Sequence, residues 1–381
     1  MDSNNALPQP NQRMKILHGP VNVGNQPWSL SRAERAAGDE SDVIVNYGTW
    51  LGYPADRTLA GVGEKTLRAT ARRSIFALSA PFRYDVLHYY FGRSYLLWDD
   101  WGFSFGRSRL VDEAALTDVR LARTLGKRCF MTLQGCDIRI AGDSNAANEW
   151  TPCGEGRCSV FSTCVQHYDK GRQAMVRRLL PLMDRVFYLN PELGRWVPGG
   201  NFLPYANVAI HDIQPAPPQP GRRPRIVHAP SDPNIKGTPR VLAALENLST
   251  RFDFELVLVQ GKSHAEAMEI YRGADMAIDQ LFAGWYGGFA VELMAMGKPV
   301  AAYIREEDSC FVPPAMWSGM PILRLRPDRL EDDLAAILAH PEALVEAGAR
   351  SRAYVERWHD PERIAAALGR IYRDPKAALE I

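Results

Sequence analysis

The chain has 381 residues, of which 46% are hydrophobic, 10% aromatic and 23% charged, and its formal net charge is +1. This length exceeds one typical hydrophobic core and fits two domains of common size. A nearly neutral chain has no overall field that would attract nucleic acid, so no nucleic-acid partner is expected. No apolar run reaches the ~18 residues that a membrane-spanning helix needs.

Residues 1–13 are polar and are expected to form a disordered tail. This start lacks the hydrophobic core of a secretory signal, so export is not indicated and a cytoplasmic location is expected. In the absence of such a signal, disulfides are not the default state of the six cysteines.

Apolar runs alternate with helical periodicity from residue 14 to residue 214, which predicts an open α/β domain. The predicted strands cover residues 14–18, 42–46, 85–90, 127–133 and 186–189. The predicted helices cover residues 29–37, 64–78, 118–125 and 170–182.

The loop after the first strand contains Gly19 and Gly24 together with Asn22, Asn25 and Gln26. A glycine loop between a strand and a helix places a ligand site at the carboxyl end of the strand. The amides offer more hydrogen-bonding groups than a turn requires. We therefore favour a ligand-binding role for this loop over a plain strand-to-helix turn.

The predicted helix at 64–78 carries Lys65, Arg68, Arg72 and Arg73 beside several apolar residues. Such a segment would suit an anionic membrane or an anionic acceptor. A solvated charged face is the more common interpretation of four charges, and it is the one we favour from the sequence.

The strand at 127–133 runs into Gln134, which is followed by Asp137 and Arg139. An acid and a base at the carboxyl end of a strand can orient an acceptor hydroxyl. They can equally form a structural ion pair, and their placement favours the functional interpretation slightly.

A loop rich in glycine and serine then carries several thiols, and His167 follows it. Thiolates suit tetrahedral zinc, and such a loop would gain from a structural metal. The candidate ligands of a structural zinc ion are Cys136, Cys153, Cys158 and Cys164. Their spacing lacks a CxxC pair, so buried free thiols or a local disulfide remain alternatives.

Residues 215–224 form a linker rich in proline, after which a second α/β series begins. Its strands are predicted at 225–229, 255–259, 274–278, 300–304 and 322–325, and its helices at 240–248, 264–272, 289–296, 329–340, 342–357 and 360–372. Lys236 and Gly237 lie in its first loop, close to a helix start, where a lysine is apt for binding phosphate.

The stretch 275–304 reads as strand, aromatic-glycine loop, apolar helix and strand. Gly284, Gly287 and Gly288 permit sharp turns, and helical periodicity begins at Phe289. Gly297 and Pro299 end that helix. Free backbone N–H groups at such a helix start can bind phosphate. The alternative is an ordinary strand-helix-strand unit whose glycines only make a turn.

The sequence TyrGlyGlyPheAlaValGluLeuMetAlaMetGlyLysProVal resembles the donor-binding signature of nucleotide-sugar glycosyltransferases of the GT-B fold, in particular glycosyltransferase family 4. The family usually has two glutamates seven residues apart. The second corresponds to Glu292, whereas Gly284 stands at the first position. Gln134 likewise stands where related proteins have a histidine, while Asp137 and Arg139 match.

The resemblance implies an α/β fold of GT-B type, with two Rossmann-like domains that face each other across a cleft. It implies an N-terminal acceptor domain at 14–214, a donor-binding domain at 225–358, and a C-terminal helix at 359–381 that returns to the first domain.

It also implies a retaining glycosyltransferase that moves a sugar from a UDP- or GDP-sugar to a glycan, lipid-linked or small-molecule acceptor. No catalytic metal is expected. Contact with the inner face of a membrane would follow from a lipid-linked acceptor.

The site residues follow from the same resemblance. Lys236, with Gly237, meets the diphosphate, and Glu292 binds the ribose. The backbone N–H groups of Tyr286, Gly287, Gly288 and Phe289 hold phosphate or sugar hydroxyls. The other site residues lie at the acceptor or the reacting sugar, and they are Gly24, Asn25, Asp137 and Arg139.

Two alternatives stay open. One is a glycosyltransferase-like binding protein that has lost turnover, which the departures at Gly284 and Gln134 favour. The other is a GT-B-fold nucleotide-sugar epimerase, which would need histidines and carboxylates to move protons; His18, His88 and His228 are its candidates.

Overall fold

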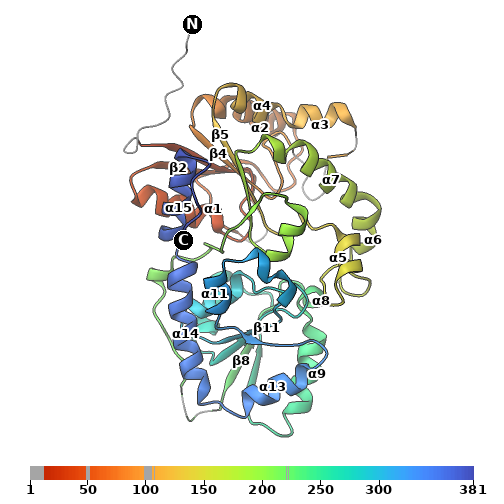
Figure 1. Cartoon of the computed structure of the whole chain (residues 1–381), viewed down its shortest axis with the longest axis vertical. Coiled ribbons are helices and arrows are strands. Elements are labelled where there is room, and N and C mark those ends of the chain that lie inside the picture. The colour runs from red at the N-terminus through yellow and green to blue at the C-terminus, as the bar shows by residue number, and fades with distance from the viewer. Residues whose placement is uncertain (1–12, 49–51, 98–104, 107, 220, 222) are drawn as a thin grey trace. The chain divides into compact units, whose positions relative to one another are not determined.

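A computed structural model describes residues 13–48, 52–97, 105–106, 108–219, 221 and 223–381 of the chain (Figure 1). The expected tail at 1–13 therefore lies outside the described residues, except for Arg13. The chain forms two compact units. The first comprises Met1–Ile140, Thr163–Val208 and Pro361–Ile381, and the second comprises Ala141–Ser162 and Ala209–Asp360.

The first unit is built on a parallel sheet of seven strands in the order β3-β2-β1-β4-β5-β6-β7. The strands are β1 (Lys15–Gly19), β2 (Glu40–Tyr47), β3 (Arg57–Ala60), β4 (Val86–Tyr90), β5 (Arg128–Leu133), β6 (Arg185–Tyr188) and β7 (Asn201–Phe202). All five strands predicted for this half are present. Edge strand β3 was not predicted, because it is only four residues long and begins with two exposed polar residues.

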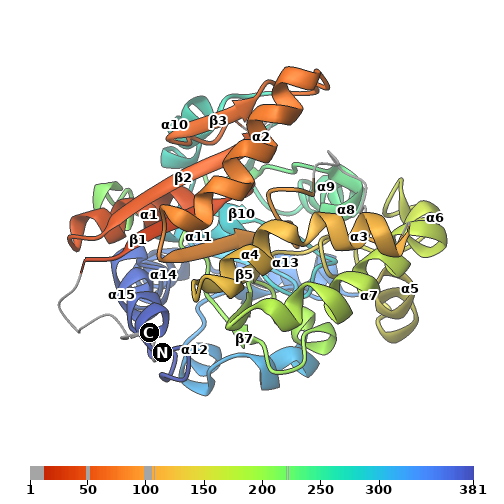
Figure 2. The same ribbon diagram turned by 90° about the horizontal axis from the view of Figure 1, so that it is seen from above.

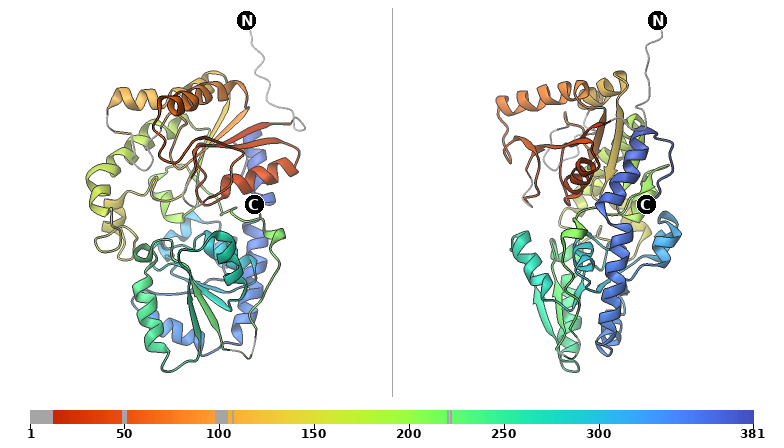
Figure 3. Two further views of the ribbon diagram at one scale, coloured as in Figure 1. Left: turned by 180° about the vertical axis from the view of Figure 1, so that it is seen from behind. Right: turned by 90° about the vertical axis from the view of Figure 1, so that its left-hand side faces the viewer.

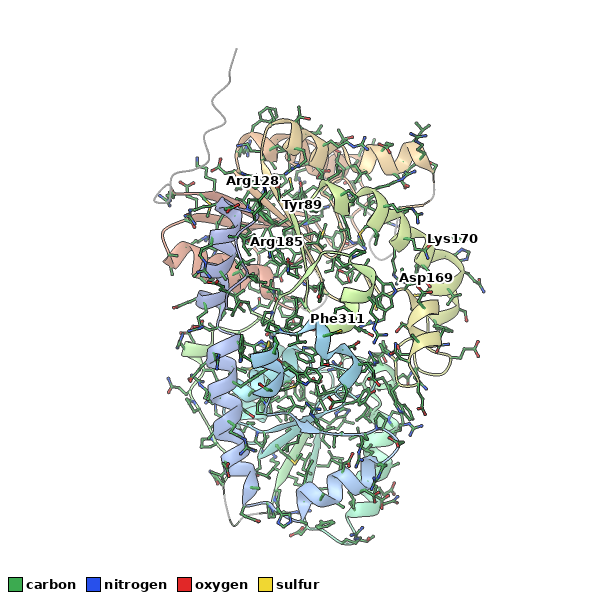
Figure 4. All side chains as sticks on the ribbon, viewed as in Figure 1. Tyr89, Arg128, Asp169, Lys170, Arg185 and Phe311 are labelled. Carbon is green, nitrogen blue, oxygen red and sulfur yellow. The ribbon has the colours of Figure 1, made fainter. Side chains whose placement is uncertain are left out.

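The helices of the first unit are α1 (Gln26–Ala36), α2 (Leu67–Ser79), α3 (Arg109–Ala115), α4 (Thr117–Thr124), α7 (Asp169–Arg178) and α15 (Pro361–Arg373), and α6 (Phe161–Thr163) lies where the two units meet in sequence. Helix α15 packs beside α1, and α2 packs beside α4 (Figure 2). Ile364, Leu368 and Ile371 of α15 are buried in the same core cluster as Ile16 of β1. Tyr89 of β4 is also buried inside this unit (Figure 4).

The second unit has a parallel sheet of five strands in the order β12-β11-β10-β8-β9. Its strands are β8 (Arg225–His228), β9 (Glu255–Leu258), β10 (Met276–Ile278), β11 (Val300–Ala302) and β12 (Leu323–Arg324). Its helices are α5 (Ala141–Ala147), α8 (Pro233–Lys236), α9 (Thr238–Leu248), α10 (His264–Arg272), α11 (Gly288–Ala295), α12 (Pro314–Ser318), α13 (Leu330–Leu338) and α14 (Ala343–Trp358). Figure 3 shows the helices against the sheet in each unit.

Local signals in the sequence account for several helix ends. Thr66 caps α2 by accepting a hydrogen bond from the Ala69 N–H. Ser263 and Glu266 form a capping box at α10. Just beyond α11, Gly297 adopts a positive φ of 73°. No helix in the described residues is both long and apolar enough to span a bilayer.

Candidate functional site

In the second unit, a buried carboxylate joins the two glycine-containing motifs. Lys236 ends α8, and its Nζ lies 2.5 Å from Oδ1 of Asp279, the residue that follows β10. Oδ2 of Asp279 accepts the N–H of Gly287 at 2.7 Å. Asp279 is 1% exposed, so it holds the lysine and the start of α11 together in a low-dielectric setting.

Packing between the two motif loops supports the same arrangement. Gly237 has a positive φ of 78°, and a Cβ placed there would lie 3.0 Å from Cβ of Leu281. The Leu281 N–H donates to the Lys236 carbonyl at 3.2 Å. The Lys236 ammonium also lies 5.9 Å from the ring centroid of Phe289. The structure therefore brings Lys236, Gly237, Gly287 and Phe289 together.

Glu292 lies one turn inside α11 and is mostly buried. Its Oε1 pairs with Nε2 of His264 at 2.9 Å, and this hydrogen bond raises the pKa of His264 above its ordinary value. His264 is the first residue of α10, whose Tyr271 packs edge-on against Phe289 at 5.1 Å. An acidic side chain beside the start of α11 can accept hydrogen bonds from ligand hydroxyls.

The aromatic side chains of the motif loop face the protein interior. The Tyr286 ring is fully buried, and its hydroxyl contacts Nε2 of His359 at 2.9 Å and the Tyr354 hydroxyl at 3.0 Å. Trp285 stacks on Tyr286 at 4.5 Å. Tyr286 can therefore present its backbone to a ligand, while its side chain fixes the loop.

Any side chain at Gly284 would be strained in this structure. Its φ is +68°, and an added Cβ would lie 2.9 Å from Cβ, Cζ and Nη1 of Arg305. Arg305 is itself held, because its guanidinium pairs with Asp308 at 3.0 Å and donates to the Trp150 carbonyl at 2.5 Å. A glutamate at position 284 would therefore require Arg305 to move.

In the first unit, the loop after β1 leaves several buried polar atoms without hydrogen-bond partners among the described residues. They are Oδ1 of Asn22, Oδ1 of Asn25 and Nε2 of Gln26. The other ends of the amides are anchored, since Asn22 donates to the Pro54 carbonyl and Asn25 to the Asn207 carbonyl, both at 2.9 Å. Buried polar atoms are rarely left unpaired, so the loop after β1 stays a candidate ligand-binding loop.

Gly24 and Asn25 form the turn that begins α1, with φ values of 71° and 61°. Because nothing lies within 4 Å of a Cβ added at Gly24, the glycine is required by the backbone conformation and not by packing. Helix α1 therefore begins directly at the loop that carries the unpaired amide atoms.

Asp137 and Arg139 are engaged by protein groups. The buried Asp137 carboxylate accepts the N–H groups of Gln134, at 2.9 Å, and of Gly135, at 2.6 Å. Burial raises the pKa of Asp137, while these hydrogen bonds act to lower it. Arg139 pairs with the buried carboxylate of Glu192 at 2.5 Å. Both residues therefore shape the loop that follows β5, and a direct contact with substrate stays a prediction.

The structure does not support the expected zinc site. Within the described residues, no group of three or more histidine, cysteine, aspartate or glutamate side chains is placed to hold a metal ion. None of the four expected ligands forms a disulfide. Cys136 and Cys164 belong to the first unit, whereas Cys153 and Cys158 belong to the segment Ala141–Ser162 of the second.

That segment is held by aromatic packing instead of a metal. Trp150 stacks on Phe282 with ring centroids 6.1 Å apart, and it packs against the apolar core of the second unit. The guanidinium groups of Arg157 and Arg240 lie 5.6 and 4.9 Å from its ring centroid. The sequence prediction places the segment Ala141–Ser162 in the first domain, because its contacts with residues far along the chain leave no local signal.

The three histidines considered for an epimerase lie inside the sheets. His18 contacts Tyr90 and Glu34, both at 2.8 Å, and His228 contacts the Ile278 carbonyl, also at 2.8 Å. His88 pairs with Tyr372 at 2.6 Å, and burial lowers its pKa well below the ordinary value. These contacts are those of core histidines and give no support to proton transfer on a sugar.

Two residues of the site were missed by the sequence analysis. Asp279 could have been suspected, because a charged residue directly after a buried strand lies where parallel sheets place ligand sites. Arg305 follows β11 in a similar position. Its pairing with Asp308 and with the Trp150 carbonyl depends on tertiary structure and has no counterpart in a sequence pattern.

The two parallel sheets with their helices define a protein of the α/β class, and comparison with solved structures identifies the arrangement as the GT-B fold. No protein-family model and no curated protein sequence matches the chain.

The solved structures that it resembles are glycosyltransferases. Sucrose-phosphate synthase from Thermosynechococcus elongatus is 16% identical, with a TM-score of 0.56, and the match covers 95% of this chain and 99% of that one. Anabaena HepE, in complex with UDP and glucose, is 11% identical with a TM-score of 0.55, and the match covers 94% and 99% of the two chains. WaaG, a glycosyltransferase of lipopolysaccharide biosynthesis, is 12% identical with a TM-score of 0.51, with 92% and 98% covered.

Proposed function

We propose that this protein is a glycosyltransferase that moves a sugar from a nucleotide-sugar donor to a hydroxyl of a glycan, lipid-linked or small-molecule acceptor. The observation that carries the proposal is the convergence of Lys236 and the Gly287 N–H on Asp279 at the start of α11, with Glu292 one turn further along that helix. The GT-B fold supports it, and so does the bound UDP in the structure of HepE.

The chemistry assigned to these residues follows from charge. Transfer breaks the bond between the anomeric carbon and the diphosphate, forms a bond from that carbon to the acceptor oxygen, and releases the hydroxyl proton. The diphosphate gains negative charge as it leaves. The Lys236 ammonium and the backbone N–H groups at the start of α11 stabilise that charge.

Asp279 also positions the ammonium group of Lys236. In the unliganded site its carboxylate neutralises the lysine at 2.5 Å. A diphosphate that binds here shares the ammonium with Asp279, which keeps the Nζ group in place. We assign Glu292 to the ribose hydroxyls, which lie beside the diphosphate in any nucleotide donor.

The first unit supplies the acceptor side of the proposal. The unpaired amide atoms of Asn22, Asn25 and Gln26 are suited to sugar hydroxyls, which both donate and accept hydrogen bonds. We assign Asp137 and Arg139 to positioning of the neighbouring loop, since Asp137 holds backbone N–H groups and Arg139 is paired with Glu192.

Retention of anomeric configuration, a UDP or GDP donor, and action in the cytoplasm at the inner face of a membrane complete the proposal. The first two rest on the resemblance of the motifs to glycosyltransferase family 4, and the third follows from a lipid-linked acceptor. The runner-up is a binding protein of the same fold without turnover, and one observation favours it: Arg305 fills the place of the missing carboxylate at Gly284.

The test is ligand-induced thermal stabilisation with a panel of nucleoside diphosphates and nucleotide-sugars. A ligand at a hundredfold excess over its Kd stabilises the folded state by ~2.7 kcal/mol. We expect nucleotides with one particular base to raise the melting temperature of the wild type. The variants Lys236→Ala and Glu292→Ala should lose most of that rise. Each variant is compared with its own unliganded form, because Lys236→Ala leaves Asp279 buried with one partner fewer.

Lys262→Ala, which removes an exposed lysine of the same unit, is the matched control and should respond like the wild type. If no nucleotide stabilises the protein, the proposed function is wrong. If a nucleotide-sugar binds but is never consumed with any glycan acceptor, the binding-protein alternative takes its place.

A further inference from the structure

The outward side of α2 in the first unit is apolar. Leu67, Ile75 and Phe82 are 89%, 69% and 67% exposed, and Leu78 lies among them. Their spacings of eight, three and four residues keep them on one side of the helix and of the short turn Ala80–Phe82 that continues it. The opposite side, with Ala69, Phe76 and Ala77, is buried.

Helix α3, close to α2 in sequence, also carries exposed apolar residues. Helix α4 packs against both α2 and α3, so the three helices lie together (Figures 1 and 2). Leu110 of α3 is 83% exposed, and Val111 is also exposed. Most of the exposed large hydrophobic residues in the described part of the chain therefore fall between residues 62 and 125. The exposed apolar residues of α2 share one side of that helix, and this side is the candidate interaction surface.

The flank of this surface is basic. Helix α2 contains three arginines and no acidic residue. Arg68 and Arg72 lie four residues apart, beside the apolar side, and Arg72 also donates to the Leu59 carbonyl. Lys65, Arg68 and Arg83 are exposed. Glu64, the nearest acid in sequence, is occupied by hydrogen bonds from the Gly61 N–H and the Thr66 hydroxyl.

We propose that this face docks on an anionic lipid surface. The face comprises Leu67, Ile75, Leu78 and Phe82, with Lys65, Arg68 and Arg83 on its flank. An apolar strip with lysine and arginine along its edge is the pattern of a helix that lies in the plane of a membrane interface. The apolar side chains enter the boundary between headgroups and acyl chains, and the cations remain at the lipid phosphates.

A lipid surface fits these residues better than a protein partner does. The apolar side chains protrude singly from one helix, and a fluid interface accommodates them without a matching groove. The excess of positive charge complements phosphate headgroups, whereas the core of a protein interface is usually depleted of charge. This docking rests on the proposed action at a membrane, but the face belongs to the first unit and the donor-binding motifs to the second, so vesicle binding can fail while nucleotide binding holds.

The test is co-sedimentation of the full-length protein with phosphatidylcholine vesicles, with and without phosphatidylglycerol. We expect binding to the anionic vesicles, weaker binding to the neutral ones, and a fall in binding as salt is raised. Arg68→Ala should weaken partitioning about fivefold, since one cation near the surface is lost. Ile75→Ser should weaken it about tenfold, since an apolar side chain no longer leaves water.

Arg363→Ala and Val345→Ser remove an exposed cation and an exposed apolar side chain elsewhere, and both should bind like the wild type. All substituted side chains are exposed, and unchanged melting temperatures verify that the variants are folded. Equal binding to both kinds of vesicle, no binding, or unaltered binding by Arg68→Ala and Ile75→Ser would each overturn the proposal. The proposal would also be overturned if, in vesicle-free solution, the wild type had the mass of a dimer and Ile75→Ser that of a monomer. The face would then join two copies of the chain.

Discussion

Gly284 shows how one residue can fix the local chemistry of the candidate site. Its backbone has a positive φ of 68°, and its missing side chain leaves room for the Arg305 guanidinium. The Gly284 carbonyl also accepts the Arg305 N–H at 2.9 Å. The two residues therefore form one packed unit, and the character of the loop depends on a glycine and an arginine where a carboxylate is usual.

We expect Gly284→Ala to destabilise the second unit by about 2–5 kcal/mol. About 1–2 kcal/mol comes from the left-handed backbone and about 1–3 kcal/mol from the clash with Arg305. Gly156→Ala isolates the first contribution, because Gly156 has a φ of +75° and open space around its Cβ position. Urea unfolding of both variants measures the difference. Equal losses would mean that Arg305 moves aside freely, and our account of this departure from the family pattern would fail.

Single residues also show where sequence reasoning stops. Lys236 was identifiable because it lies beside a glycine at a helix start, which is a local pattern. Its partner Asp279 lies 43 residues away, and the sequence offers many other acids as candidates. The pairing between Arg139 and Glu192 spans 53 residues. Local patterns thus predict which residue types a site uses, while the partners that orient them are set by tertiary packing.

At the scale of elements, the segment Ala141–Ser162 is the most unusual feature. It leaves the first unit, packs on the second and returns. Trp150 anchors it by stacking on Phe282, and its carbonyl accepts a hydrogen bond from Arg305. Because Arg305 also packs on Gly284, the segment is connected to the loop that carries the glycine motif.

We expect Trp150→Ala to loosen this segment and to cost about 2–3 kcal/mol, less than the ~3–5 kcal/mol of a fully buried tryptophan, because Trp150 is partly exposed. Limited trypsin digestion should then cut faster after Arg157, whose guanidinium packs on the same ring. Glu149→Ala changes the exposed neighbour and should digest at the wild-type rate. Unchanged cleavage in Trp150→Ala would show that other contacts hold the segment.

Regular elements were predictable because parallel strands are buried on both faces and so form continuous apolar runs. Strands β1, β4 and β8, for instance, fall within about two residues of the predicted ranges. Strand β3 and the segment Ala141–Ser162 lack such runs. Contacts with residues distant in sequence determine where these two segments pack, so no local periodicity predicts them.

At the scale of the whole molecule, the chain passes between the two units several times, and its last helix belongs to the first. Ile364, Leu368 and Ile371 of α15 lie in one cluster with Ile16, Val86 and other residues of the first sheet. The Tyr372 hydroxyl bonds to His88 of β4 at 2.6 Å. The first unit is therefore incomplete until the C-terminal helix has been made, whereas the core of the second unit is formed from residues that precede it.

This difference predicts that a destabilising substitution in α15 lowers the stability of the first unit alone. Leu368 is fully buried, and Leu368→Ala should remove about 2–5 kcal/mol of stability. Amide hydrogen exchange should accelerate in β1 and β4, because the cavity that Leu368→Ala creates lies against the sheet of the first unit. Exchange in β8 and β10 of the second unit should stay unchanged. Arg363→Ala, an exposed change on the same helix, should leave exchange unaltered throughout. If β8 and β10 accelerate equally, the two units unfold as one cooperative body, and the assignment of α15 to the first unit alone does not describe its energetics.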